Sequence, residues 1–180
     1  MASEIRTGDF GLLIAYLAPG YVALWGSRPL SPTLDSWMSG SSPSSVGDFL
    51  FATVAAVIAG LLASTARWAI IDRIHHRTGI KEPNLDFARL SEKVSAFGRL
   101  VDDQYRYYQF YGNTLLALLW SYGVHLYLVA VWRDALDGRE LLLVPAAVLL
   151  FAGSRNTLRT YYRRVRQLLG EEVPPILMGG

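Results

Sequence analysis

Apolar residues fall into four runs along the chain, and polar stretches separate the runs. The longest run, 110–131, has 22 residues without Asp, Glu, Lys or Arg. A helix of roughly 20 apolar residues can cross the hydrocarbon core of a bilayer, because each residue adds about 1.5 Å. Tyrosines precede this run and Trp132 follows it, as expected where a helix meets the two membrane interfaces. The pattern therefore predicts a transmembrane helix over 110–131.

Three further runs predict transmembrane helices on the same ground. The runs at 10–26 and 49–66 contain no charged residue. The fourth span is placed at 139–156, where the uncharged stretch 141–153 has only 13 residues. A stretch this short needs residues at both ends to reach the length of a span.

The polar segment 67–109 lies between the second and third spans. Apolar side chains recur in it at steps of three and four residues, which indicates an amphipathic helix over 86–108 that runs on into the third span. Its apolar stripe consists of Phe87, Leu90, Val94, Phe97 and Val101. We expect this stripe to project beyond the membrane, where it would need a partner such as a second copy of the chain.

Charge decides the number of spans. The 180 residues suit one domain, and 52% of them are apolar while 18% are charged, so the charges are segregated from the apolar runs. A four-span arrangement puts 14 of the 17 lysines and arginines on the side of both termini, whereas three spans divide them 9 against 8. Positive residues mark the cytoplasmic side. We therefore predict an all-α integral membrane protein, a single membrane domain over 1–180. It has four transmembrane helices, an amphipathic helical extension in the cytoplasmic loop 67–109, a cytoplasmic tail at 157–180 and both termini inside.

Small residues recur along the second span at the spacing of one helix face. One row contains Ala52, Ala56, Gly60 and Ser64, and a parallel row contains Ala55, Ala59 and Ala63. Small residues at this spacing let two helix backbones approach closely in a membrane. The rows predict a helix contact, and they leave open whether the partner helix belongs to the same chain or to another copy.

Polar or small residues recur every fourth position along the third span. The row consists of Gln109, Asn113, Ala117, Ser121 and His125. Polar side chains are costly in lipid, so they face protein or water. Two interpretations stay open for Gln109, Asn113, Ser121 and His125: hydrogen bonding inside a packed bundle, or the lining of a water-filled path.

Candidate chemistry lies just beyond the second span. Asp72, His75 and His76 fall at i, i+3 and i+4, which puts the carboxylate beside both imidazoles on one helix face. Such a pair can act as a general base, although anchoring of a helix end is the simpler interpretation. A metal site would need further ligands, and the chain has no cysteine. We predict no metal and no cofactor.

Arginines dominate the segment after the fourth run. They are Arg155, Arg159, Arg163, Arg164 and Arg166. Attraction to anionic lipids of the cytoplasmic leaflet explains such a segment, and binding of RNA, a nucleotide or an acidic partner protein is the alternative. The net charge of +2 is too small to indicate a nucleic-acid binder.

Two fragments of the chain carry a resemblance. They are Phe10-Gly-Leu-Leu-Ile-Ala-Tyr-Leu-Ala-Pro-Gly-Tyr and Tyr105-Arg-Tyr-Tyr-Gln-Phe-Tyr. Both fragments resemble stretches of small bacterial four-span inner-membrane proteins. In size and layout the chain is also similar to small membrane effectors of bacterial antiviral systems. The resemblance implies a location in the bacterial inner membrane and, at the level of architecture, a role in antiviral defence.

Three functions are compatible with these patterns. The first is a non-enzymatic homo-oligomer in the bacterial inner membrane, forming a pore or a membrane-perturbing assembly controlled from the cytoplasmic side. The second is a membrane anchor that recruits a soluble cytoplasmic partner protein through the 86–108 helix and the basic tail. The third is a membrane-bound enzyme that uses Asp72, His75 and His76.

Overall fold

The computed structural model describes residues 11, 13–38, 46–83, 88, 91–128, 138 and 140–170, and these residues form helices and no strand. The all-α prediction is confirmed for this part of the chain. The elements in chain order are η1 (Leu13–Leu17), α2 (Ala18–Ser27), η2 (Arg28–Leu30), α3 (Pro32–Met38), α4 (Val46–Arg67), η3 (Trp68–Asp72), α5 (Arg73–Arg77), α7 (Val94–Leu100), η4 (Val101–Tyr105), α8 (Arg106–Leu128) and α9 (Glu140–Leu169).

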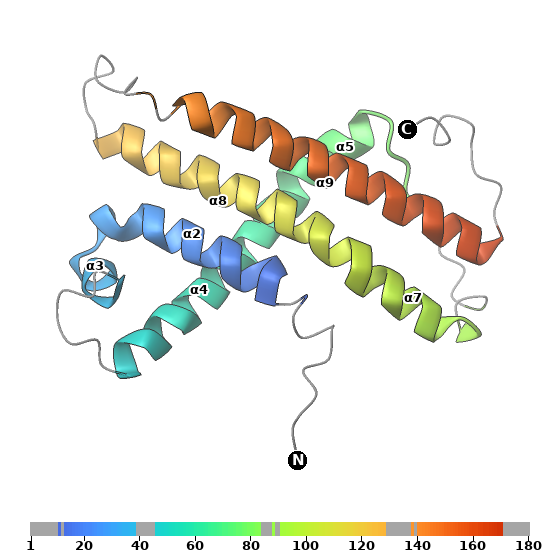
Figure 1. Cartoon of the computed structure of the whole chain (residues 1–180), viewed down its shortest axis with the longest axis horizontal. Helices are drawn as coiled ribbons and strands as arrows, with labels where there is room; N and C mark the ends of the chain where they lie inside the picture. The colour runs from blue at the N-terminus through green and yellow to red at the C-terminus, as the bar shows by residue number, and fades with distance from the viewer. Residues whose placement is uncertain are drawn as a thin grey trace.

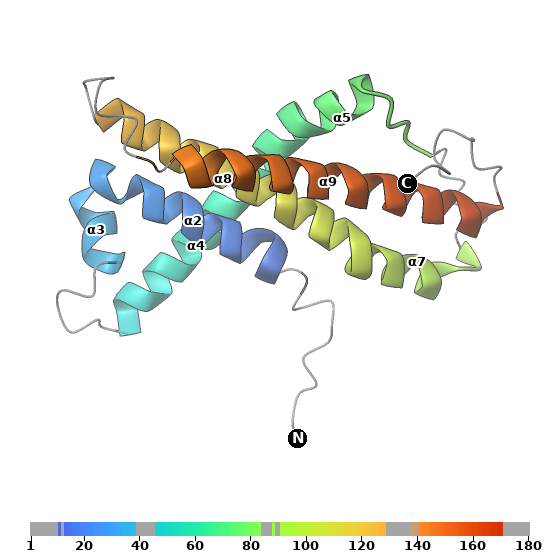
Figure 2. The same cartoon turned by 45° about the horizontal axis from the view of Figure 1, so that its top comes forward.

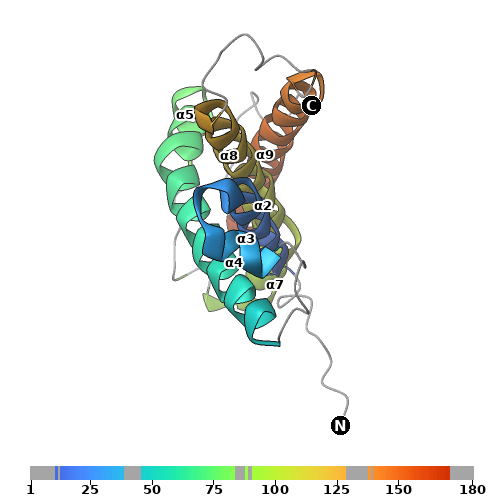
Figure 3. The same ribbon diagram turned by 90° about the vertical axis from the view of Figure 1, so that its left-hand side faces the viewer.

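The elements join into four long helical segments, which are η1–α2, α4–η3–α5, α7–η4–α8 and α9 (Figure 1). Segment α8 is central: it packs against α2, α4 and α9. Viewed along the molecule, α8 lies between α4–α5 on one side and α9 on the other (Figure 3). Helix α4 crosses α2 and α8 obliquely, while α9 runs beside α8 in the opposite direction (Figure 2).

The crossing of α2 and α4 is built from small residues. Ala52, Ala56 and Gly60 are buried there, and Ser64 is half-buried. A Cβ atom at Gly60 would lie 2.0 Å from the carbonyl oxygen of Tyr16, and one at Gly20 would lie 1.8 Å from that of Ala56. The first row of small residues thus packs against η1 and α2 of the same chain, because only hydrogen at these positions lets the two backbones approach so closely.

Two helices among the described residues are long and apolar enough to cross a membrane, Val46–Arg77 and Leu141–Leu169. Their large apolar side chains point outward. On α4 the exposed ones include Phe49, Phe51, Val54, Ile58, Leu61 and Leu62, and on α9 they include Leu141, Leu142, Val144, Val148 and Leu149. A helix in water turns such side chains toward the protein core, so this outward belt is the arrangement expected of helices surrounded by lipid.

A compact core occupies the opposite end of the long axis from α3. It contains Ile80, Tyr108, Leu158, Tyr161, Tyr162, Val165 and Leu169, with Phe97, Leu100, Val101 and Tyr105 packed against it. The stripe predicted to need a second copy therefore finds part of its partner in the same chain. Phe97 and Val101 pack on α9, while Val94 is 65% exposed. Phe87 and Leu90 lie outside the described residues.

A turn interrupts the helix predicted over 86–108. Glu92 and Lys93 form this turn between the helical residue Ser91 and α7, which begins at Val94. The Lys93 ammonium donates a hydrogen bond to the carbonyl oxygen of Leu168, 2.6 Å away, which ties this turn to the end of α9. From Val94 onward the helix continues through η4 into α8, as the spacing predicted.

Candidate functional site: a buried polar layer

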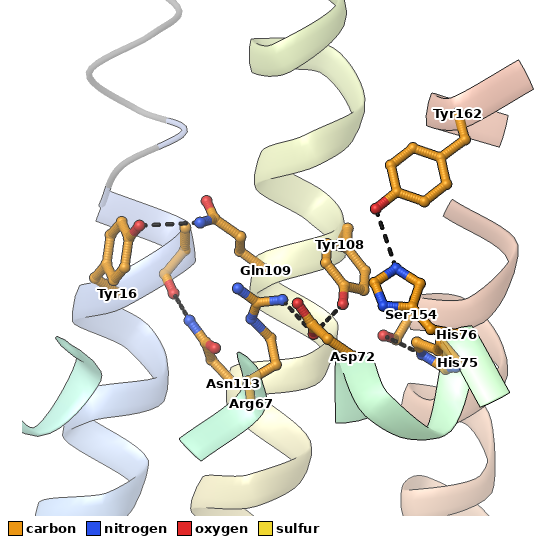
Figure 4. Close-up of polar contacts among 11 residues, drawn as sticks. Tyr16, Arg67, Asp72, His75, His76, Tyr108, Gln109, Asn113, Ser154 and Tyr162 are labelled. Atoms are coloured by element: carbon orange, nitrogen blue, oxygen red, sulfur yellow. Dashed lines mark hydrogen bonds and ion pairs between the residues drawn. The ribbon is translucent and has the colours of Figure 1, made fainter. Parts of the chain in front are cut away.

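A layer of polar side chains crosses the bundle between its apolar belt and the core formed by α7 and α9. Four helical segments contribute to it (Figure 4). We use the name polar layer for Tyr16, Arg67, Asp72, His75, His76, Tyr108, Gln109, Asn113, Ser154 and Tyr162. Buried polar groups are costly unless they bond to one another, so the partners within this layer decide what it can do.

An ion pair forms the centre of the polar layer. The Arg67 guanidinium donates to Asp72 Oδ1 across 2.7 Å, and the side chains of the two residues are only 4% and 14% exposed. The Tyr108 hydroxyl donates to the same carboxylate oxygen. Arg67 also lies over the Tyr108 ring, 4.7 Å from its centroid. The cation is therefore neutralised inside the protein by one carboxylate and one aromatic face.

Two features adapt α8 to this buried cation. Gly112 leaves room for it, because a Cβ at that position would lie 2.6 Å from Arg67 Cδ. Tyr108 precedes the third apolar run, and burial raises the pKa of its phenol far above the usual range. The hydroxyl consequently keeps its proton and remains a donor to Asp72.

The two histidines connect α5 to α9 and do not bond to Asp72. His75 Nε2 lies 3.1 Å from Ser154 Oγ, and the His75 side chain is 0% exposed. His76 Nε2 lies 3.3 Å from the Tyr162 hydroxyl, with the two rings stacked. The predicted pairing of Asp72 with these imidazoles is therefore replaced by pairing with Arg67, because α4 places a cation closer to the carboxylate.

The predicted polar row of the third span faces the first span. Gln109 Nε2 donates to the Tyr16 hydroxyl at 3.0 Å, and Asn113 Nδ2 donates to the Ala15 carbonyl oxygen at 2.8 Å. Ser121 Oγ donates to the Val22 carbonyl oxygen at 3.1 Å. These bonds correspond to the packed-bundle interpretation within one chain. His125 lies further along α8, with its ring beside that of Tyr122.

Three π-helical segments supply groups to the polar layer or border it. Segment η1 contains Ala15 and Tyr16, η3 ends at Asp72, and η4 contains the buried Gln104. A π-helical turn is rare, and single turns of it are frequent at functional sites. Here the widened turn of η1 presents a carbonyl oxygen to Asn113. The geometry therefore concentrates irregular backbone at the level of the buried charges.

The five arginines of the predicted basic tail divide into two groups. Arg155 donates to the Thr78 carbonyl oxygen at 2.8 Å and also to its hydroxyl, and Arg166 donates to the Lys81 carbonyl oxygen at 2.7 Å. These two fasten the segment after α5 onto α9. Arg159 and Arg164 are exposed, and Arg163 is half-buried. Only part of the basic segment is thus presented outward.

Two concave surfaces lie outside the polar layer. An apolar groove of about 630 Å³ lies between α2, α4 and α8, and its lining includes Ala59, Ala63, Leu62, Leu116 and Trp120. A cleft of about 530 Å³ lies between α7 and α9, and its lining includes Arg99, Asp103 and Arg164. The described residues contain no group of three or more His, Asp or Glu side chains placed to hold a metal ion.

Sequence reasoning found part of the polar layer and missed its centre. Asp72, His75, His76, Gln109 and Asn113 were singled out by their spacing. Arg67 was counted only as a charge at the end of a span, Tyr108 only as one of the tyrosines before the third run, and Ser154 was assigned no role. Their part depends on the tertiary contact between three segments, although an arginine directly after an apolar run was an available signal.

Comparison with known proteins adds no relationship to these observations. The chain matches no family model, no curated protein and no solved structure. The function is therefore inferred from the arrangement of the described residues.

Proposed function

We propose that the chain is a non-enzymatic four-span protein of the bacterial inner membrane that self-associates into a pore or another membrane-perturbing assembly, as in antiviral defence. Its cytoplasmic part, formed by α5, α7 and the end of α9, would control the assembly. The proposal rests on helix direction, on one unfilled groove and on the position of the polar layer.

Helix direction supports four spans. Residues Ala15 and Val22 bond to Asn113 and Ser121 respectively, so the first and third segments run in the same direction. Helices α4 and α9 run the opposite way (Figure 1). Alternating direction is what consecutive crossings require. The segments α5, α7 and the arginine-rich end of α9 then share one end of the molecule, which agrees with a positive cytoplasmic side.

The groove between α2, α4 and α8 is the observation that favours self-association. Its lining includes Ala59 and Ala63 of the second small-residue row, while the first row is already occupied by α2. Small residues in a lipid-facing groove allow a helix to approach closely. A helix of a second copy is a natural occupant, because copies in one membrane meet at high effective concentration.

A pore would have to run between copies. Gln109, Asn113 and Ser121 are bonded to the first segment of the same chain, so they line the bundle interior. His75 and His76 of the polar layer, together with Arg155, link the crossing helices to the cytoplasmic part, because each bonds to a partner on another segment. Movement of α9 against α5 would break these bonds, which is how the cytoplasmic part would act on the spans.

The mass of the protein in mild detergent, measured by light scattering and corrected for bound detergent, tests this proposal. We expect an oligomer at micromolar concentration. Ala63→Leu fills the groove and should shift the protein toward single copies. Ala152→Leu is the matched control, since it adds the same side chain at an exposed position of α9. A wild-type protein that runs as a single copy contradicts the oligomer and the pore.

The second candidate function, an anchor for a soluble partner protein, is favoured by the cleft between α7 and α9. Arg99, Asp103 and Arg164 give this cleft charges of both signs on the cytoplasmic part. A single-copy wild type would leave this function as the better account. An enzyme built on Asp72 and His75 has less support, because Asp72 is paired with Arg67 and His75 is fully buried.

A further inference from the structure

The outward face of η3 and α5 combines apolar and basic side chains. Ile70 is 50% exposed and Ile74 is 41% exposed. Arg73 and Arg77 are exposed as well. The spacings from Ile70 to Arg73 and from Ile74 to Arg77 are three residues, and those from Ile70 to Ile74 and from Arg73 to Arg77 are four. Residues at these spacings are neighbours on an α-helical surface. Arg73, Ile74 and Arg77 lie in α5, and Ile70 lies in the adjoining π-helical turn of η3. We call these four outward side chains the interface patch.

No ion pair among the described residues neutralises the positive charge of the interface patch. The ion pairs of the described residues join Arg28 to Asp35, Arg67 to Asp72 and Arg106 to Asp102, and none of them includes Arg73 or Arg77. Asp72 precedes Arg73 directly in sequence, but its carboxylate turns inward to Arg67 and Tyr108. The inward ion pair therefore leaves two adjacent arginines with outward charge.

Further arginines lie near the end of α5. Arg155 reaches across from α9 and bonds to Thr78, the residue after Arg77. Arg159 is one turn further along α9 and is exposed. Its charge acts on Arg155 and reaches as far as His75. The basic character thus extends from α5 onto α9 at one level of the molecule.

We propose that the interface patch binds anionic phospholipid headgroups of the cytoplasmic leaflet, with Arg73 and Arg77 on the phosphate groups and Ile70 and Ile74 against the upper acyl chains. This inference rests on the proposed membrane position of α4. Basic residues next to a transmembrane helix attract anionic lipids, and arginine pairs with phosphate through two parallel hydrogen bonds.

A lipid fits the interface patch better than an acidic protein does. The patch follows the exposed apolar side chains of α4, which include Leu61 and Leu62, and the exposed Trp68 of η3. Charged groups that begin where an apolar belt ends match the order of headgroup and acyl chain in a leaflet. An acidic protein segment would pair with the arginines but would leave this belt uncovered.

Tryptophan quenching by brominated lipids measures the composition around the interface patch. The full-length protein is reconstituted into vesicles of phosphatidylcholine with one third phosphatidylglycerol, and bromine is placed on the acyl chains of one lipid species at a time. Trp68 is 64% exposed and lies five residues before Arg73. Subtracting the emission of a Trp68→Phe variant isolates its signal from that of the other four tryptophans.

We expect brominated phosphatidylglycerol to quench Trp68 more than its mole fraction predicts, because each arginine should raise the local ratio of phosphatidylglycerol to phosphatidylcholine roughly fivefold. Arg73→Gln with Arg77→Gln should bring quenching back to the bulk composition. Arg99→Gln with Arg164→Gln is the matched control, since it removes two exposed arginines from the cleft between α7 and α9. Enrichment should also fall in 0.5 M salt, which screens exposed charges.

The outcomes separate this inference from the proposed function. If each brominated lipid quenches Trp68 in proportion to its mole fraction, the interface patch has no preference for anionic headgroups and the inference is wrong, while α4 remains a membrane helix. If neither brominated lipid quenches Trp68, the helix does not contact lipid at this level, and the proposed membrane position fails as well. If phosphatidylglycerol is still enriched around Trp68 in the variant with Arg73→Gln and Arg77→Gln, other residues bind the anionic lipid. This result also overturns the inference.

Discussion

Arg67 shows how one residue can connect an apolar helix to the polar end of the same chain. It follows an apolar helix directly, yet it is 3% exposed and does not extend to solvent. A buried cation is tolerated only with a close counter-charge, and Asp72 supplies this charge five residues later. The backbone between the two is the π-helical segment η3. The position of α5 is thereby tied to the pairing of one arginine.

A double-mutant cycle measures how much the ion pair of Arg67 and Asp72 contributes to the free energy of unfolding. Asp72→Ala leaves the Arg67 charge buried without its partner and should lower the free energy of unfolding by about 3–5 kcal/mol. Arg67→Met together with Asp72→Ala removes both charges and should cost less than Asp72→Ala alone. Unfolding in mixed micelles of dodecyl sulfate and a mild detergent gives these free energies.

The ion pair of Arg28 and Asp35 is the matched control for this cycle. Its nitrogen–oxygen distance is also 2.7 Å, but the Asp35 side chain is 54% exposed. Water and ions screen such a pair, so Asp35→Ala should cost less than about 1 kcal/mol. If Asp72→Ala costs no more than Asp35→Ala, the pair in the polar layer does not hold α5 in place.

Spacing identified candidate residues of the polar layer but not their partners. Asp72 and His75 both belong to the polar layer, but they lie in the consecutive elements η3 and α5 and bond to different partners. Their partners, Arg67 and Ser154, depend on how α4, α8 and α9 cross, and no local pattern encodes that. The interior position of Arg67 also depends on the space above Gly112, which is visible only in three dimensions.

At the scale of elements, the two small-residue rows of α4 have different surroundings. The first row, with Ala56 and Gly60, contacts the backbone of η1 and α2. The second row, with Ala59 and Ala63, lines the apolar groove. Substitutions at Gly60 consequently report on the fold of one chain, and substitutions at Ala63 report on what fills the groove. Loss of assembly in a Gly60 variant would not by itself identify an interface.

Gly60→Ala should destabilise the crossing of α2 and α4. The added methyl group would lie 2.0 Å from the Tyr16 carbonyl oxygen, so the helices must move apart, at a cost of about 1–3 kcal/mol. Gly123→Ala on α8 is the matched control, because no atom lies within 4 Å of the position of its Cβ. Replacing a helix glycine in open space should raise stability by up to about 1 kcal/mol.

The free energy of unfolding in the same mixed micelles distinguishes the two glycine variants. An equal change in both would show that close approach at Gly60 does not determine the crossing. A larger loss for Gly60→Ala, with the mass per particle unchanged, would assign the first small-residue row to the interior of one chain.

Element boundaries were predictable where the hydrophobic period is long and unbroken. The runs at 49–66 and 110–131 correspond to α4 and α8, because uninterrupted apolar residues define a helix whatever surrounds it. The helix predicted over 86–108 is interrupted by a turn at 92–93. Its apolar period continues through Glu92 and Lys93, but a tertiary hydrogen bond from Lys93 to α9 stabilises a turn there.

At the scale of the whole molecule, the distribution of charge agrees with the direction of the helices. Alternating helix direction places α5, α7 and the basic end of α9 together, and it places α3 at the other end (Figure 1). The same division follows from counting lysines and arginines under a four-span arrangement. The amphipathic stripe led to the expectation of a second copy, whereas α9 of the same chain covers Phe97 and Val101. Folding back of the chain end is a long-range event that periodicity does not encode.

Cysteine labelling tests the four-span arrangement directly, because the chain contains no cysteine of its own. Single cysteines are introduced at the exposed positions Ser36, Ser95 and Gln167. A maleimide that cannot cross membranes should label Ser36→Cys in cells with a permeabilised outer membrane. It should label Ser95→Cys and Gln167→Cys only after the inner membrane is opened.

Gln167→Cys is the decisive variant, since the fourth crossing determines on which side it lies. If α9 crosses the membrane, Gln167 shares the cytoplasmic side with Ser95, as the core between α7 and α9 requires. Labelling of Gln167→Cys in cells with an intact inner membrane would show that α9 does not cross the membrane. It would also separate α9 from α7 by a bilayer, which the contacts of Phe97 and Val101 with the α9 core do not permit.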